Sequence, residues 1–88
     1  MESMLVAVDV IALCRAEGEI TPLRFRGELR ERPFKGEVLE VVRKRRMGHL
    51  GAETMLYECW VNLWGKRELL ELKYHFASGA WKLICLMC

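Results

Sequence analysis

The sequence predicts a small, mostly β protein in which about six antiparallel strands form a meander, barrel-like or folded as a sandwich, with at most one short helix. Three observations support this fold class. Apolar and polar residues alternate in several short segments, β-branched and aromatic side chains are concentrated in those segments, and glycine-containing turn sequences separate them. A chain of 88 residues fits one domain, so we assign residues 1–88 to a single small β domain.

The first two strands are predicted to form a hairpin. Residues 8–16, VDVIALCRA, are rich in β-branched and apolar side chains, and residues 23–30, LRFRGELR, alternate between apolar or glycine positions and charged ones. The sequence EGE at 17–19 is a turn signal between them. Pro22 lacks a backbone N–H and therefore suits the beginning of the second strand.

Four more strands are predicted in the rest of the chain. Glycines, together with proline or serine, mark the connections at residues 31–36, 48–53, 65 and 78–79. The segments between them contain alternating or continuous apolar residues, as strands covered on one or both faces do. The predicted strands span residues 37–46, 54–64, 69–76 and 80–87.

Helices are the alternative for two segments, residues 3–16 and 66–76, because the apolar residues of each can also be placed on one helical face. In the β interpretation, one apolar set from each strand faces the interior. The core is then predicted to contain Ile11, Leu13, Leu23, Phe25, Val42, Tyr57, Val61, Leu72, Tyr74, Trp81 and Leu83.

The composition indicates a partner. Hydrophobic residues make up 52% of the chain, which is more apolar surface than a compact monomer of this size covers easily. A homodimer is the simplest arrangement that covers it, because one self-complementary patch serves both chains; another protein is the other possibility. The longest early apolar run is interrupted by Asp9 and preceded by Glu2, so we expect neither a membrane span nor an export signal, and we predict a cytoplasmic protein.

Catalytic and metal chemistry are not predicted. Cys85 and Cys88 form a C-x-x-C pair, but a zinc site requires four ligands and no second pair is present. His49 and His75 stand in no recognisable arrangement with a nucleophile, and no glycine-rich phosphate loop occurs. We therefore expect a non-enzymatic protein without a cofactor or metal.

The run RKRR at 43–46 raises the alternative of nucleic-acid binding. In a strand, Arg43 and Arg45 face one side and Lys44 and Arg46 the other, so the run supplies two pairs of charges. One pair could extend a basic row on the neighbouring strand into a stripe of about five charges. The net charge of +2 is modest for such a protein, and charged residues also protect strand edges. The candidate residues are Arg24, Arg26, Arg43, Lys44, Arg45 and Arg46.

The hairpin sequences VIALCRAEGEITPLRFR and LKYHFASGAWKL resemble those of small bacterial β proteins. This resemblance implies a fold and no particular residue function. The sequence thus predicts a non-catalytic, self-associating interaction module, with a nucleic-acid-binding module as the alternative.

Overall fold

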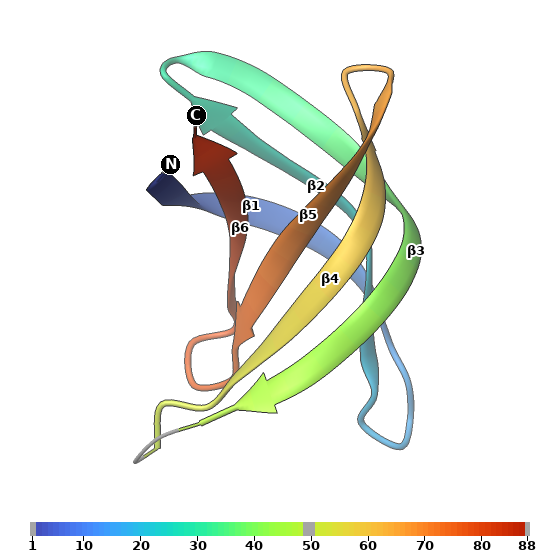
Figure 1. Cartoon of the computed structure of the whole chain (residues 1–88). Helices are drawn as coiled ribbons and strands as arrows, with labels where there is room; N and C mark the ends of the chain where they lie inside the picture. The colour runs from blue at the N-terminus through green and yellow to red at the C-terminus, as the bar shows by residue number, and fades with distance from the viewer. Residues whose placement is uncertain (1, 49–50, 88) are drawn as a thin grey trace.

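The computed structural model is a barrel of six antiparallel strands (Figure 1). It describes residues 2–48 and 51–87, and their side chains at 4–48 and 51–84. These residues form no helix, so both helical alternatives are wrong, and no segment among them is a helix that could cross a membrane. The strands are β1 (Glu2–Cys14), β2 (Ile20–Leu29), β3 (Arg32–Met47), β4 (Thr54–Leu63), β5 (Lys66–His75) and β6 (Ala80–Met87).

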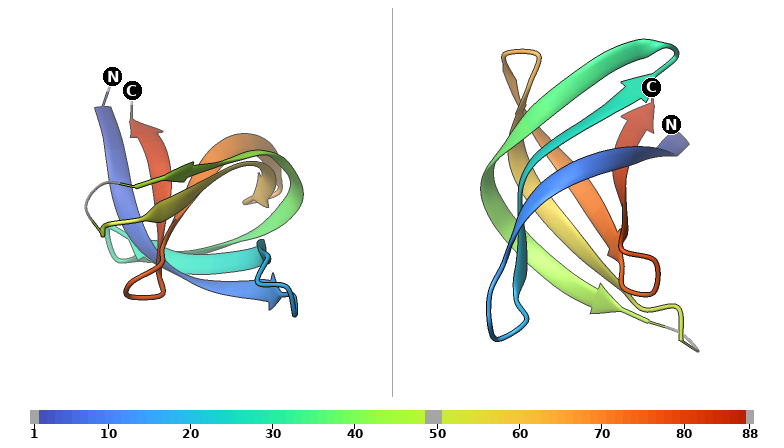
Figure 2. Two further views of the ribbon diagram at one scale, coloured as in Figure 1. Left: turned by 90° about the horizontal axis from the view of Figure 1, so that it is seen from below. Right: turned by 180° about the vertical axis from the view of Figure 1, so that it is seen from behind.

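Every strand pairs with the next one along the chain, and the first pairs with the last. The β1–β6 ladder runs from Glu2 opposite Met87 to Val8 opposite Trp81. The first and last strands therefore end side by side, as both views in Figure 2 show. The predicted six-stranded antiparallel meander is confirmed, and the barrel, not the sandwich, is the form it takes.

The predicted turn at residues 17–19 is confirmed. The Gly18 N–H donates to the Arg15 carbonyl at 2.9 Å, and the Arg15 N–H donates to the Glu19 carbonyl at 2.8 Å. Gly18 has a φ of 98°, a left-handed conformation that glycine adopts without steric cost. The turn brings β1 and β2 together as the hairpin that the sequence predicts.

The predicted connection at residues 31–36 is wrong, because β3 already begins at Arg32. The glycine there has a packing role: Gly36 lies opposite Phe25, and a Cβ at Gly36 would overlap the Phe25 ring. In the next inward pair, Gly27 lies opposite Phe34, whose ring covers it in the same way. The two rings meet edge to face, with centroids 6.4 Å apart. Glycine therefore lets an aromatic ring cover the facing strand at both positions.

The core lies inside the barrel and receives side chains from all six strands. Of the predicted core residues, six are buried and Tyr74 packs against the cluster while half-buried. Four predictions are wrong, because the side chains are 42–56% exposed. The confirmed buried residues are Phe25, Tyr57, Val61, Leu72, Trp81 and Leu83; the exposed ones are Ile11, Leu13, Leu23 and Val42.

Three β-bulges explain half of these errors and shape the barrel. Leu23 on β2 has no partner in the ladder with β1. Leu39 and Val42 on β3 have no partners in the ladder with β4. A bulge changes the phase of alternation, which turns the extra side chain away from the core. All three bulged residues are exposed, at 42, 49 and 48% respectively.

Candidate functional site

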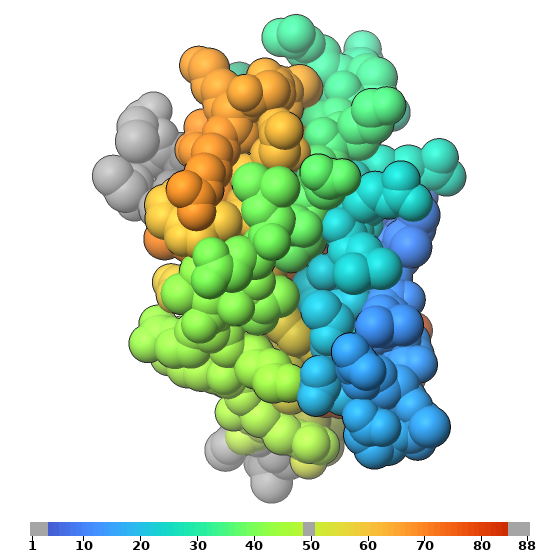
Figure 3. All heavy atoms as spheres, turned by 90° about the vertical axis from the view of Figure 1, so that its right-hand side faces the viewer, coloured from blue at the N-terminus to red at the C-terminus, as the bar shows by residue number. Residues whose placement is uncertain are grey.

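The strands β2 and β3 separate over half of their length. Their ladder contains six pairs and ends at Arg24 opposite Glu37. Beyond that pair, residues 20–23 remain bonded only to β1 and residues 38–47 only to β4, within the described ladders. We call these two segments the open seam. Figure 3 faces this side of the barrel and shows atoms of β4 between β2 and β3.

A small cavity of about 240 Å³ lies in the open seam. Two contacts cross it: the Tyr57 hydroxyl donates to the Ile20 carbonyl oxygen at 2.6 Å, and Lys44 Nζ lies 3.9 Å from Glu19 Oε2. Burial, and then the nearby charge of Glu19, raise the pKa of Tyr57 above its ordinary value. The seam is therefore held by one hydrogen bond and one exposed ion pair instead of a ladder. Its lining residues are Glu19, Thr21, Val41, Val42, Arg43, Lys44 and Tyr57.

The run 43–46 lies on the β3 side of the open seam. Its predicted split into two pairs is confirmed by register: Lys44 lies opposite the inward-facing Tyr57, whereas Arg43 and Arg45 lie opposite Glu58 and Leu56 on the other face. Three of the four charges have carboxylate partners. Arg43 pairs with Glu58 at 3.8 Å, Lys44 with Glu19, and Arg46 donates through Nε to Glu53 at 3.0 Å. Among the described residues, Arg45 alone of the run has no such partner.

The run does not join the basic residues of β2. Arg24 and Arg26 lie opposite Glu37 and Lys35. Arg43 follows Glu37 by six positions, which is about 20 Å of strand. Arg26 pairs with Asp9 at 3.4 Å. The run instead adjoins the acidic β1–β2 turn, as the Lys44–Glu19 pair shows. The six predicted residues are thus all exposed, but they form two separate groups.

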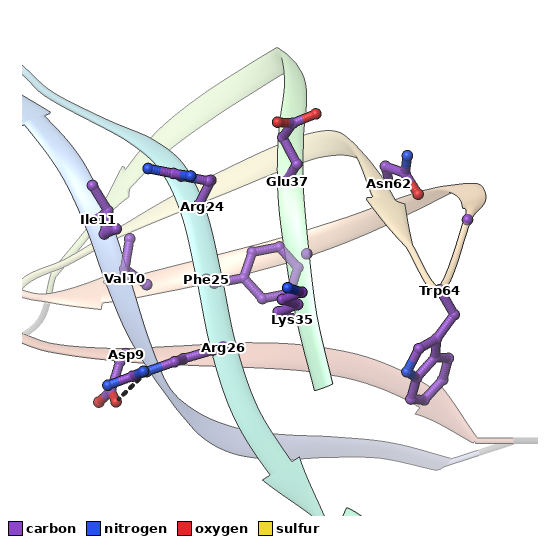
Figure 4. Close-up of a pocket in the computed structure, with 12 residues that line it drawn as sticks. Asp9, Val10, Ile11, Arg24, Phe25, Arg26, Lys35, Glu37, Asn62 and Trp64 are labelled. Atoms are coloured by element: carbon purple, nitrogen blue, oxygen red, sulfur yellow. Dashed lines mark hydrogen bonds and ion pairs between the residues drawn. The ribbon is translucent and has the colours of Figure 1, made fainter. Parts of the chain in front are cut away.

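A larger groove, of about 790 Å³, lies beside Arg24 and Arg26 of β2. Figure 4 shows Arg24, Glu37 and Asn62 along its rim and Trp64 at the end opposite Ile11. Phe25 and Gly36 are buried and form its floor. We call this cavity the outer groove; it is lined by Asp9, Val10, Ile11, Arg24, Phe25, Arg26, Lys35, Gly36, Glu37, Asn62, Trp64 and Gly65.

Three polar residues of the outer groove are not among the site residues that the sequence predicts. Lys35 was assigned to a connection, and Trp64 to the end of a buried strand. Trp64 is in fact 65% exposed, in the two-residue turn between β4 and β5. The sequence carries two signals for this position: alternation gives Trp64 the same parity as the exposed Asn62, and Gly65 follows it as a turn residue. The three polar residues are Lys35, Glu37 and Asn62.

The turn that carries Trp64 is strained. Trp64 and Gly65 have φ values of 53° and 75°, as a type I′ hairpin turn requires at both central positions. Asparagine or glycine is favoured at the first of them, and a bulky residue there costs about 1 kcal/mol or more. Trp64 packs edge to face against Phe34, with ring centroids 6.3 Å apart. The chain therefore keeps a large aromatic ring at the rim of the outer groove at a cost in backbone energy.

The cysteines and histidines form no comparable site among the described residues. Cys59 is fully buried, and burial raises the pKa of its thiol to about 12, whereas Cys14 is exposed. His75 has a buried Nε2 without a hydrogen-bond partner. No group of three potential metal ligands occurs in the parts of the chain that the structure describes. His49, Cys88 and the Cys85 side chain lie outside the described residues and side chains.

The fold and its surfaces define an up-and-down barrel of six strands with two open surfaces, the seam and the groove. Comparisons with protein-family models, curated proteins and solved structures give no match for this chain.

Proposed function

We propose that the protein is a non-catalytic interaction module that binds a second copy of itself through the seam face, defined as Leu23, Leu39, Glu40, Val42 and Arg45. The carrying observation is the arrangement around Val42. This side chain is 48% exposed, and Glu40 and Arg45 stand on either side of it in the sequence, both exposed and without an ion-pair partner among the described residues.

The charge order of β3 makes the seam face self-complementary. Glu37 and Glu40 precede Val42, and the basic run follows it. A two-fold axis near Val42 would place two β3 segments antiparallel, so that Glu40 of one copy faces Arg45 of the other. The axis repeats the contact, so that Arg45 of the first copy also faces Glu40 of the second, as in every symmetric dimer.

The three bulged residues supply the apolar part of this contact. Leu23 and Leu39 flank the point where the β2–β3 ladder ends, and Val42 follows on the same strand as Leu39. Bulges interrupt the regular edge that another strand would pair with, and charged side chains on an edge also discourage such pairing. The proposed contact is therefore made by side chains and stops at two copies, instead of extending by strand addition.

Sedimentation equilibrium over a range of concentrations tests this proposal. We expect a dimer whose dissociation constant rises at least tenfold in Val42→Asp. Leu69→Asp is the matched control, because Leu69 is 46% exposed on β5, outside the seam face, and should leave the constant within twofold. A monomer at all concentrations, or equal weakening by both substitutions, would overturn the proposal.

A charge exchange tests the antiparallel arrangement separately. Glu40→Arg and Arg45→Glu should each weaken the dimer, because each places like charges opposite each other. The double variant should recover most of the affinity, since the pair is restored with its signs exchanged. If the double variant does not recover affinity, the two-fold arrangement around Val42 is wrong, although self-association through another arrangement would still be possible.

The alternative function, nucleic-acid binding, has less support. Four of its six candidate residues are in ion pairs, and the six form two separate groups on the surface. The candidates are Arg24, Arg26, Arg43, Lys44, Arg45 and Arg46. A cytoplasmic location is also proposed, and the free thiols of Cys14 and Cys59 support it, since cysteines stay reduced there.

A further inference from the structure

We propose that the outer groove binds a nucleotide unit, with the base against Trp64 and the phosphate at Arg24 and Lys35. The unit belongs either to a free nucleotide or to a single-stranded nucleic acid. This inference concerns a different surface from the seam face and does not depend on self-association. A cavity of about 790 Å³ lies within the size range of small-molecule sites, which suffices for one nucleotide.

Trp64 provides the platform for a base. Its side chain is 65% exposed at the rim, while the contact with Phe34 holds it in place. Exposed aromatic rings beside a basic groove are how proteins stack unpaired bases without selecting a sequence. The left-handed backbone of Trp64 is a further indication, because strain at such a position persists where a side chain has a use beyond packing.

Two cations of the groove are free to meet a phosphate. Arg26 is engaged by Asp9 at 3.4 Å, whereas neither Arg24 nor Lys35 has an ion-pair partner within the described part of the chain. Register places Lys35 opposite Arg26 and Arg24 opposite Glu37, so both free cations rise from the same outward side of β2 and β3. The groove carries three basic and two acidic residues, which favours a ligand with few phosphates.

The acidic and amide groups of the rim fit the rest of such a ligand. Glu37 and Asn62 are cross-strand partners on β3 and β4, and both are exposed at the groove. A carboxylate accepts hydrogen bonds and an amide both donates and accepts them. Ribose hydroxyls and the polar edge of a base present those complementary groups. Figure 4 shows this rim between Arg24 and Trp64.

Fluorescence anisotropy of labelled oligonucleotides tests the proposal. The probes are a single-stranded DNA 12-mer, an RNA 12-mer and a DNA duplex, each titrated from 50 to 300 mM salt, with adenosine monophosphate as an unlabelled competitor. The groove variants are Trp64→Asn, which suits the left-handed turn, and Arg24→Gln with Lys35→Gln. The matched control, Lys73→Gln with Lys82→Gln, removes the same charge from β5 and β6, outside both the groove and the seam face. A cooperative unfolding transition in each variant confirms that it folds.

The expected result is binding of single strands at 50 mM salt that is at least tenfold weaker in each groove variant and within threefold of the original in the control. The logarithmic salt slope should fall by about 1.4 in the double groove variant, since each lost phosphate contact to a single strand removes about 0.7. Competition by the mononucleotide at a similar affinity would identify a free nucleotide as the ligand. Affinity that grows with strand length would identify a single strand.

Three outcomes would overturn the proposal. They are no binding of any probe at 50 mM salt, equal losses in the groove variants and the control, and preference for the duplex. The last two would assign binding to general surface charge, not to Trp64 and its neighbours.

Discussion

Tyr57 of β4 reaches across the open seam, and its hydroxyl donates a hydrogen bond to the carbonyl oxygen of Ile20 on β2 at 2.6 Å. The Ile20 carbonyl belongs to the stretch of β2 that has no ladder with β3. A side chain thus takes the place of a strand at one point of the barrel wall. This bond and the buried ring of Tyr57 connect the core directly to the seam.

We predict that Tyr57→Phe lowers the free energy of unfolding by about 1 kcal/mol, because it removes this bond and leaves the carbonyl without a side-chain partner. Urea unfolding measures the change. Tyr74→Phe is the control, since no hydrogen bond of the Tyr74 hydroxyl is present among the described residues, and it should change stability by less than half as much. Equal effects would show that the bond across the seam contributes nothing specific.

The raised pKa of Tyr57 predicts a loss of stability in alkali. The folded protein favours the neutral phenol. The contribution of Tyr57 to the free energy of unfolding is therefore complete below the ordinary pKa of 10, and it is lost as the pH rises through the higher pKa of the folded state. The free energy of unfolding, measured between pH 9 and 11, should therefore decline less steeply with pH in Tyr57→Phe than in the original protein. An unchanged slope would contradict the assignment.

Cys59 predicts a second alkaline effect and a difference in thiol reactivity. Its pKa is raised to about 12 by burial, so the folded state favours the thiol, and stability falls as the pH rises above about 9. Cys59→Val should reduce that fall.

Alkylation at pH 8 followed by peptide mapping should modify Cys14 at least a hundredfold faster than Cys59, which is fully buried. Comparable rates would show that the barrel opens readily near β4.

Gly36→Ala should destabilise the protein by about 1–3 kcal/mol, because the added methyl group overlaps the ring of Phe25. The effect should shrink in a Phe25→Leu background, where the ring is absent. Urea unfolding of the two single variants and the double variant gives the coupling energy. Strictly additive losses would mean that Gly36 is required for another reason.

Two leucines on β5 test the inward and outward faces of the barrel. Leu72 is fully buried and Leu69 is 46% exposed. Leu72→Ala should cost about 2–5 kcal/mol, whereas Leu69→Ala should cost less than about 1 kcal/mol. The same measurement applies to both, and similar costs would contradict the described alternation of β5.

The sequence predicted the strands well where one alternating set was clearly apolar. On β5 and β6 the inward residues Leu72, Trp81 and Leu83 were found correctly. On β1 both alternating sets are apolar, and the structure places Val8 and Val10 inward where Ile11 had been chosen. One local signal does distinguish the two sets: the charged Asp9 belongs to the set of Ile11, and this set is the one that faces outward.

The bulges and the functional surfaces were beyond local patterns. Leu23 and Val42 were assigned to the core by alternation that a bulge interrupts, and a bulge depends on the facing strand. The same applies to the outer groove, whose residues come from β1 to β4 and the turn after β4. The basic residues were identified correctly as exposed, but the division into two groups follows from where the β2–β3 ladder ends.

The pairing of β1 with β6 closes the barrel between residues that are far apart in the sequence. Glu2 meets Met87, so the last ladder joins residues from opposite ends of the chain. Contacts between distant residues form late, because the entropy of closing a long loop must be overcome before they contribute. Joining β6 to β1 through a short linker and opening the chain at the Gly18 turn would convert that ladder into a local hairpin. The β1–β2 ladder would then be the one that joins the two ends, because a closed barrel of six strands always leaves one ladder between distant residues. Such a permuted chain should therefore reach the same barrel at a similar rate.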